Sequence, residues 1–413
     1  MRQKKRHITP RNSDRVMSWL LLLLLLCLTA CSSSDDTLTT TPEHLQPGNG
    51  TKLYIYVYAP QIATPTRSTY DGDVSAVEPE SNVYSMHFWV FTHMSHQLIG
   101  YYAPTEAPGL SAASPYELFQ LTIDETYAAT PAASRETVDV YVVANVTPET
   151  CNLTFNENTT QDELENAVMS KDGNLDPFGV TNPVTRVPVG IGLPMSGVLR
   201  NQSVTGDAPV LRLGEGTEVA VLKLYRTVSK IRFAFSNQTG SESLSINSIT
   251  LNSGMISLSE YVFMTDESPY DRHTCHIKID NGYDTTTPSP NLLEAPVTDV
   301  AENDNPVYYA WGNQELDPAQ YEGHIEAGVS TGALTQRLCY LRESDKKLQG
   351  EIKYQIGDGE EQTATFQMVD EGGFSRNHVW TVYAYQAQAR LHVVVVDTAP
   401  WKLTEYNNEF YNW

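Results

Sequence analysis

Residues 52–67 read KLYIYVYAPQIATPTR, and this stretch decides how we interpret the rest of the chain. Aliphatic and aromatic residues alternate strictly over its first seven positions, with Leu53, Ile55 and Val57 on one face and three tyrosines on the other. A period of two residues is typical of a β-strand. We therefore predict a strand that begins at the first residue of this stretch and ends before Pro60.

A turn-prone linker follows the predicted strand. It contains one basic residue, Arg67, followed by Ser68 and then by Asp71 and Gly72, and exposed linkers of this kind are common sites of proteolysis. Burial of an aliphatic side chain contributes roughly 1.5 to 3 kcal/mol. If the chain were cut after Arg67 and the strand left, it would leave an apolar groove bordered by unpaired backbone, which a strand from another molecule would fill.

The first thirty residues are predicted to be a secretory signal. A leader with six basic residues precedes the apolar run 19–28, which is too short to span a membrane as a mature helix. The run closes on Leu28-Thr29-Ala30-Cys31, which resembles a bacterial lipobox and predicts lipidation of Cys31. Residues 31–51 would then form a polar tether.

Charge and cysteine content restrict the function classes. The formal net charge of the 413-residue chain is −23, which argues against binding to nucleic acid or to an anionic membrane through charge. Beyond the leader and Cys31, three cysteines remain, so at most one intramolecular disulfide can form, and Cys275 with Cys339 is a possible pair. No cysteine and histidine spacing typical of a zinc site is present.

The chain is long enough for two domains, and its pattern predicts an all-β fold. Short alternating segments recur between turn residues, which is typical of β-sandwiches. Thr160 and Glu163 have the spacing of a capping box and predict one short helix. The predicted strands are 83–91 and 97–102 as a hairpin, 137–146, 245–251, 254–258, 307–311, 351–356, 363–368, 374–383 and 391–396.

Residues 218–235, EVAVLKLYRTVSKIRFAF, form the longest strand-like stretch. Two basic residues, Arg226 and Lys230, interrupt its apolar positions, and we interpret them as structural side chains that lie along a sheet and reach acidic partners. We place a domain boundary just before this stretch, near residues 214–216. The predicted domains are 52–215 and 216–413.

The sequence offers no convincing catalytic or metal site. His87, His93 and His96 are close together in sequence, but no carboxylate lies near them, so we predict ordinary strand histidines. Ser196 lies in Met-Ser-Gly and lacks the motif of a hydrolase nucleophile. We therefore predict a non-enzymatic protein without a cofactor. The many tyrosines and tryptophans suit strands and interfaces, although they would also stack on sugars.

Several motifs, in this order, resemble the fimbrillin family of Bacteroidales, the subunits of type V pili. They are the lipobox at Cys31, the strand with its Pro-Thr-Arg linker, VYVVANV at 140–146, LPMSG at 193–197, LYRTVSKIRF at 224–233, RNHVWTVYAY at 376–385 and HVVVVDTAPW at 392–401.

The resemblance implies two transthyretin-like β-sandwich domains and export as an outer-membrane lipoprotein. It further implies cleavage after Arg67 by an arginine-specific surface protease, and polymerisation with other subunits by donor-strand exchange at the cell surface. Carried onto this chain, it makes residues 52–58 the displaced strand and 391–413 the candidate donor segment, with Leu391, Val393, Val395 and Trp401 as its apolar residues. The tail from Thr398 alternates less regularly than a donor strand should.

Two classes of function remain open at this point. The first is a pilus subunit that is activated by proteolysis. The second is a pilus tip or anchor, or a surface lipoprotein that binds a glycan or a protein and keeps its first strand. The two classes differ in whether Arg67 is cleaved and whether the lipidated Cys31 remains on the mature protein.

Overall fold

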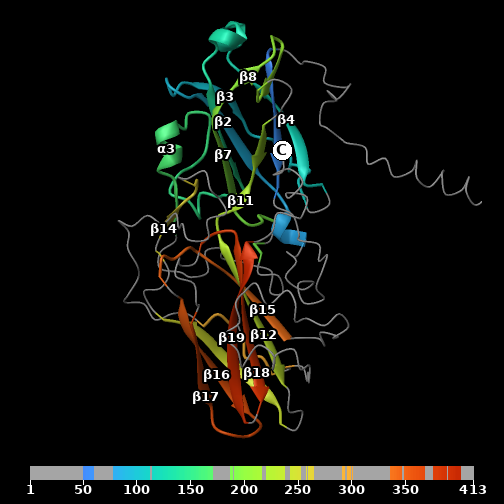
Figure 1. Ribbon diagram of the computed structural model, residues 1–413, viewed down its shortest axis with the longest axis vertical. Helices are drawn as coiled ribbons and strands as arrows, with labels where there is room; N and C mark the ends of the chain where they lie inside the picture. The colour runs from blue at the N-terminus through green and yellow to red at the C-terminus, as the bar shows by residue number, and fades with distance from the viewer. Residues whose placement is uncertain are drawn as a thin grey trace, which may run out of the picture. The chain divides into compact units, whose positions relative to one another are not determined.

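The computed structural model describes sixteen stretches of the chain (Figure 1). They are residues 50–59, 78–111, 114–170, 187–188, 190–215, 220–237, 242–252, 257, 259–264, 291–293, 295–298, 300, 335–346, 348–367, 375–387 and 389–400. Strands dominate these residues, so the predicted all-β fold class is confirmed.

Short helical segments connect some of the strands. The α-helices of the described residues are α2 (Glu125–Ala129) and α3 (Gln161–Glu165), and the 3-10 helices are η2 (Glu78–Ser81) and η3 (Ala132–Ser134). In the described part of the chain, no helix has the length and apolar character that crossing a bilayer would require.

The first sheet contains the strand predicted from the opening stretch, and that prediction is confirmed at both of its ends. Its strands are β1 (Lys52–Tyr58), β4 (Tyr116–Thr122), β8 (Val204–Thr205), β9 (Val210–Leu213) and β10 (Val221–Lys223). They follow the order β10-β1-β9-β8, and β4 pairs with β1 along its whole length.

The second sheet contains the predicted hairpin, which is also confirmed. Its strands are β2 (Met86–Thr92), β3 (Leu98–Tyr102), β5 (Val138–Ala144), β7 (Met195–Gln202) and β11 (Tyr225–Arg226), in the order β11-β7-β5-β2-β3. β2 and β3 pair antiparallel, and β5 is the strand predicted at 137–146.

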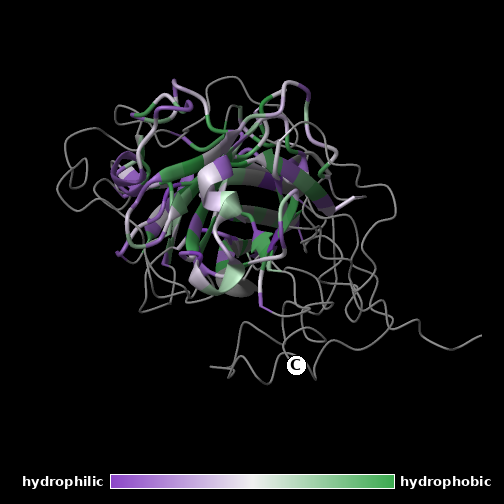
Figure 2. Cartoon of the chain, turned by 90° about the horizontal axis from the view of Figure 1, so that it is seen from above, coloured by the Kyte–Doolittle hydropathy of each residue, from purple (hydrophilic) through white to green (hydrophobic). Residues whose placement is uncertain are grey.

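These two sheets pack around one apolar core. Ile55 and Phe119 from the first sheet belong to the same buried cluster as Phe88 and Val140 from the second. Figure 2 shows hydrophobic positions alternating with hydrophilic ones along the strands, as expected when one face of each sheet is buried.

A second apolar cluster covers the other face of the β2–β5 sheet. Trp89 and Tyr141 are fully buried there, together with Leu164 of helix α3. The predicted capping box is confirmed: the Thr160 side chain accepts from the backbone of Glu163, and the Glu163 side chain accepts from the backbone of Thr160. The helix is short, and its packing depends on this cap.

Two further sheets form a second sandwich. One contains β12 (Ser229–Asn237), β15 (Thr335–Leu341), β18 (His378–Ala387) and β19 (Arg390–Pro400), in the order β15-β12-β18-β19. The other contains β13 (Leu244–Leu251), β16 (Gln349–Ile356) and β17 (Gln362–Gln367). Phe233 and Val382 of the first share a buried cluster with Ile249 and Ile352 of the second.

The strands predicted in the second half are confirmed where they can be compared. The predictions at 245–251, 351–356, 363–368 and 391–396 match β13, β16, β17 and β19, and the prediction at 374–383 overlaps β18, which begins only at His378. Residues 307–311 and most of 254–258 lie outside the described residues. A small pair, β6 (Val168–Ser170) with β14 (Ser259–Tyr261), was not predicted.

The strand-like stretch 218–235 contains three strands in its described part. In this stretch the chain forms β10, β11 and β12, and each strand belongs to a different sheet. β10 pairs with β1, β11 pairs with β7, and β12 pairs with β15 and β18. The alternation persists across the breaks because each short strand buries its own face, so the periodicity alone could not show the changes of sheet.

The predicted domain boundary at 214–216 stays a prediction. All described residues lie within one compact unit. The pairing of β10 with β1 and of β11 with β7 shows that residues 221–226 complete the sheets of the first half. A boundary that follows the sheets would therefore lie near Thr227 and Val228.

Gly197 in β7 offers a test of how closely β10 crosses β7. A Cβ atom at Gly197 would lie 2.4 Å from the Lys223 carbonyl oxygen and 2.7 Å from the Leu222 side chain. We expect Gly197→Ala to lower the free energy of unfolding by about 1 to 3 kcal/mol, because backbone would have to move. Gly109→Ala is the control, since its Cβ would meet only the Glu117 side chain, at 3.5 Å.

Urea denaturation of the three proteins, followed by circular dichroism, measures this difference. Equal unfolding midpoints for the two variants would show that the crossing is not tight.

Candidate functional site

The candidate site is β1 together with the strands that hold it. β4 pairs antiparallel with all seven residues of β1, from Lys52 with Thr122 to Tyr58 with Tyr116. On the other edge β9 pairs in parallel with residues 52–54, and β10 pairs in parallel with residues 56–58. β1 is therefore an interior strand with hydrogen-bonding neighbours on both edges.

The side chains of β1 are buried on both faces. Leu53, Ile55 and Val57 are fully buried in the core between the first two sheets. On the opposite face Tyr54 and Tyr58 are each only 3% exposed. At roughly 1.5 to 3 kcal/mol for each aliphatic side chain, the apolar row alone approaches the net stability of many domains, roughly 5 to 15 kcal/mol.

Backbone hydrogen bonds fix both ends of β1. At the start, the Lys52 amide donates to the Pro209 carbonyl at 2.9 Å. At the end, the Leu224 amide donates to the Tyr58 carbonyl at 2.9 Å, and the Ala59 amide donates to the Pro115 carbonyl at 2.9 Å. The strand is thus held over its full length up to the point where the linker begins.

Arg67 and Ser68, the predicted cleavage residues, lie outside the described residues, as does Cys31. Their predicted roles stay predictions. Residues 60–77 contain no lysine and no arginine other than Arg67, so an arginine-specific protease has one peptide bond to cut in this segment.

A buried charged cluster holds η2, the first described element after residues 60–77. Lys230 Nζ lies 2.8 Å from Glu80 Oε1 of η2, and the Tyr340 hydroxyl donates to the same oxygen. Arg226 Nε donates to the Glu80 carbonyl at 3.1 Å, and Arg226 Nη2 donates to the Ser81 hydroxyl at 3.1 Å. The interpretation of Lys230 as a basic residue with an acidic partner is confirmed.

This cluster is almost free of solvent. Glu80 and Arg226 are 0% exposed and Lys230 is 1% exposed. Removing one partner from a buried ion pair leaves an uncompensated charge and costs about 3 to 5 kcal/mol. The cluster therefore fixes η2 firmly against β11, β12 and β15.

A second buried ionic group lies where β14, β15 and β18 meet. Arg376 Nη2 and Nε lie 2.8 and 3.0 Å from Glu343 Oε2, and Arg376 Nη1 donates to the Val262 carbonyl at 3.0 Å. The Glu343 amide donates to Glu260 Oε2 at 2.9 Å. Burial raises the pKa of Glu260 to about 8; the Arg376 guanidinium opposes this rise, and the Glu343 carboxylate adds to it.

Sequence reasoning identified the basic members of the first cluster but missed Glu80, Glu260 and Glu343. Arg226 and Lys230 were recognisable as charges inside an apolar stretch. The three glutamates were not, because the chain contains many acidic residues and no local pattern distinguishes these three. Their partners are distant in sequence, and only the fold brings them together.

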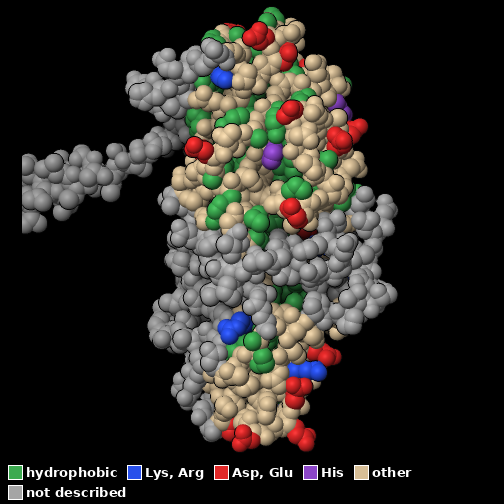
Figure 3. All heavy atoms as spheres, turned by 180° about the vertical axis from the view of Figure 1, so that it is seen from behind, with side chains coloured by type: hydrophobic (Ala, Val, Ile, Leu, Met, Phe, Trp, Pro, Cys, Tyr) green, Lys and Arg blue, Asp and Glu red, His purple; other side chains and the backbone are tan. Residues whose placement is uncertain are grey.

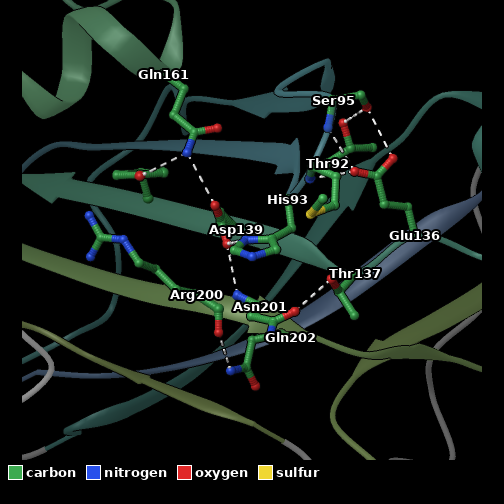
Figure 4. Close-up of polar contacts among 12 residues, drawn as sticks. Thr92, His93, Ser95, Glu136, Thr137, Asp139, Gln161, Arg200, Asn201 and Gln202 are labelled. Atoms are coloured by element: carbon green, nitrogen blue, oxygen red, sulfur yellow. Dashed lines mark hydrogen bonds and ion pairs between the residues drawn. The ribbon is translucent and has the colours of Figure 1, made fainter.

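The prediction that no carboxylate lies near the three histidines is wrong for His93. Asp139 Oδ1 lies 2.9 Å from His93 Nδ1 and accepts from the Asn201 amide at 2.7 Å, and its Oδ2 accepts from Gln161 Nε2 at 3.1 Å (Figure 4). Asp139 is far from His93 in sequence, but Asp139 of β5 pairs with Phe91 of β2, and His93 follows β2 directly. These bonds join the β2–β3 turn, β5, β7 and α3, so the arrangement is structural.

The other polar residues considered from the sequence also have structural partners. His87 Nδ1 lies 2.9 Å from the Tyr101 hydroxyl, and burial lowers the His87 pKa. His96 is exposed in the turn after β2. The hydroxyl of Ser196 is buried and donates to the Val262 carbonyl at 2.6 Å. Within the described ranges, no group of His, Cys, Asp and Glu side chains is placed to hold a metal ion.

The candidate donor residues belong to β19 as far as the structure describes them. Leu391 and Val393 pair with Gln386 and Ala384 of β18, and Val395 pairs with Val382. Leu391 is buried in the core of the second sandwich. Trp401 and the rest of the tail lie outside the described residues, so the donor role stays a prediction.

The cysteine pair also stays a prediction, because Cys275 lies outside the described residues. Cys339 is buried, and its thiol donates to the Leu292 carbonyl at 3.8 Å. Cys151 is a buried thiol whose pKa is raised by burial.

The visible surface shows no extended charged patch of one sign over the described residues. Figure 3 shows acidic side chains scattered over this face, with hydrophobic side chains exposed between them. This pattern suits a protein whose surface charge favours solubility.

The raised pKa of Glu260 predicts how stability changes with pH. The folded protein holds this proton up to about pH 8, whereas an unfolded glutamate loses it near pH ~4.3. Stability should therefore fall as the pH rises from about 5 to 8, by on the order of 1 kcal/mol per pH unit. Glu260→Gln should remove most of this fall, because the amide stays neutral.

Urea unfolding midpoints at pH 5, 6.5 and 8 measure the effect, with Glu106→Gln at an exposed glutamate as the control. A pH slope that is the same in the Glu260→Gln variant and in the unmodified chain would contradict this assignment.

No family model matches the chain, and no curated protein matches it. Among solved structures, the tip fimbrial protein Mfa3 of Porphyromonas gingivalis is 12% identical, with a TM-score of 0.43, over 83% of this chain and 98% of that one. A fimbrial assembly protein of Parabacteroides distasonis is 11% identical, with a TM-score of 0.38, over 84% and 95%.

A third solved structure, a Parabacteroides distasonis protein whose name proposes a role in cell adhesion, is 16% identical. Its TM-score is 0.45, over 86% of this chain and 98% of that one.

Proposed function

We propose that this chain is a structural subunit of a cell-surface fimbrium, exported as a lipoprotein and activated by removal of its first strand. In this proposal a protease cuts after Arg67, β1 leaves with the lipidated leader, and a strand of a neighbouring subunit takes its place. The chain catalyses nothing and needs no cofactor. It reaches the cell surface as an outer-membrane precursor and then becomes part of the filament.

The observation that carries the proposal is the position of β1. The strand is interior and buried, yet the cuttable segment 60–77 follows it directly. Its departure would expose the edges of β4, β9 and β10 together with the core that Leu53, Ile55 and Val57 now fill. Unpaired edges beside an apolar groove are what strand addition requires.

The geometry also restricts the replacement strand. It must run antiparallel to β4 and parallel to β9 and β10, as β1 does, and it must carry apolar residues at alternate positions. Residues 401–413 form the segment of the candidate donor that follows β19. At about 3.3 Å per extended residue, these residues span roughly 40 Å, enough to enter a neighbouring subunit.

A second function remains in consideration, supported by the buried hydrogen bonds that hold β1 in place. A pilus tip or anchor, or a surface lipoprotein that binds a glycan or a protein, would keep β1 and the lipid on Cys31. Intact β1 gives such a protein a complete first sandwich. The two functions predict different N-termini for the mature surface protein.

Sequencing of the N-terminus of the surface-extracted protein separates them. A start at Ser68 supports the fimbrial subunit, and a lipidated Cys31 on the mature protein supports the anchor or binding lipoprotein.

Substitution of Arg67 tests the role of cleavage. We expect Arg67→Ala and Arg67→Lys both to leave lipidated precursor and to abolish filaments seen by electron microscopy. Arg67→Lys keeps the charge, so its failure would show that the protease, and not the charge, is responsible. Filaments of normal number and length from both variants would rule out this route to assembly.

A further inference from the structure

The hydroxyl of Tyr54 is a polar atom that the groove around β1 leaves unpaired. Tyr54 is only 3% exposed, and its neighbours in register are Gln120 of β4 and Arg212 of β9. Its hydroxyl oxygen is buried, yet no group among the described residues forms a hydrogen bond with it. β1 therefore carries into its groove a polar atom that the groove does not match.

The mismatch belongs to the tyrosine face of β1 and not to its core face. Leu53, Ile55 and Val57 on the core face are 0% exposed and belong to the apolar cluster between the two sheets. Tyr56 lies on the tyrosine face but is more exposed than Tyr54, and its hydroxyl is not a buried unpaired atom. Tyr54 and Tyr56 thus offer a matched pair, in which the same chemical group is buried without a partner at one position only.

A buried hydroxyl without a partner weakens the hold of the groove on β1. In the free strand, water forms hydrogen bonds with this hydroxyl, and burial removes them without a replacement. Phenylalanine has nearly the same shape and lacks the hydroxyl, so it loses no such hydrogen bonds on burial. The groove should therefore hold a strand with an apolar residue at this position more tightly than it holds β1.

We propose that Tyr54 determines the direction of strand exchange, because at this position the groove selects an apolar residue over the tyrosine of β1. An incoming strand with such a residue removes an unpaired polar atom from the interior. The released β1 regains the hydration of its tyrosine. Cleavage of the linker cannot by itself supply this preference, since it changes none of the contacts between β1 and the groove.

The occupant to which we commit is a strand of a second copy of this chain, and this commitment rests on the proposed function. Departure of β1 leaves β4 on one side of this position and β9 on the other, so both edges are open to a new strand. Residues 401–413, which follow β19, include Leu403 and Phe410. A second copy can therefore supply an apolar residue without a hydroxyl.

Competition between peptides tests the selection. Full-length protein is cut with an arginine-specific protease, in a background where Arg186 and Arg272, the other arginines beyond the leader that lie outside the described residues, are replaced by lysine. Synthetic peptides of residues 52–59 are added at increasing concentration. Gel filtration and mass spectrometry in moderate urea then measure how much of the fragment that contains β1 is released.

We expect the Tyr54→Phe peptide to release half of the fragment at a concentration at least about fivefold lower than the peptide of native sequence, because it buries no unpaired hydroxyl. The Tyr56→Phe peptide is the control and should stay within about twofold of the native sequence. Equal or weaker competition by the Tyr54→Phe peptide would overturn the proposal.

Urea denaturation of the uncut full-length protein gives a second measurement, which decides the matter if the cut fragment does not exchange. Tyr54→Phe should raise the urea midpoint of unfolding, whereas Tyr56→Phe should leave it unchanged. A midpoint that Tyr54→Phe lowers or leaves unchanged would contradict the mismatch.

The outcome is separable from that of the proposed function. If the Tyr54→Phe peptide competes better but the Arg67 variants still build filaments, the selection stands as a property of the groove and the fimbrial route fails. If the Arg67 variants fail to build filaments while the three peptides compete equally, the fimbrial route stands and the selection fails.

Discussion

The pairing of β1 on both of its edges is the constraint on which the first sandwich depends. A strand at the margin of a sheet can leave and expose one edge, but an interior strand separates two sets of neighbours. Here β4 lies on one side and β9 and β10 on the other, and among the described strands β1 is the one that pairs with both sides. The first sheet is therefore continuous only while some strand occupies this position.

The stretch from β10 to β12 links that position to the second sandwich. β10 pairs with β1, β11 contributes Arg226 to the buried charged cluster, and β12 contributes Lys230 before it enters the second sandwich. A buried ion pair is weak evidence for added stability, because desolvation offsets much of the attraction. The ion pair instead fixes the position of η2, because Lys230 and Tyr340 both contact the same carboxylate oxygen of Glu80.

Much of the fold followed from local pattern because each strand buries one face. β1, the β2–β3 hairpin, β5 and the capped helix α3 were predicted near their observed positions for this reason. The stretch 218–235 looks like one uninterrupted strand pattern although its strands belong to three sheets, because alternation reports burial and not sheet membership. The close approach of β10 to Gly197 became apparent only in the fold. Neither Glu80 nor Asp139 could be paired with its partner, since both contacts join residues distant in sequence.

The two edges of β1 differ in a way that bears on how one strand could replace another. Cleavage of the linker leaves all contacts of β1 with its neighbouring strands intact. It only removes the tether that keeps the strand at a high effective concentration near its own groove. Along one edge β4 pairs without interruption, whereas along the other the pairing changes from β9 to β10 at Ile55. The pairing on this second edge therefore consists of two separate blocks, residues 52–54 with β9 and residues 56–58 with β10. In the exchange that we propose, an incoming strand that begins at the Tyr58 end would compete with β1 first for β10 and then for β9.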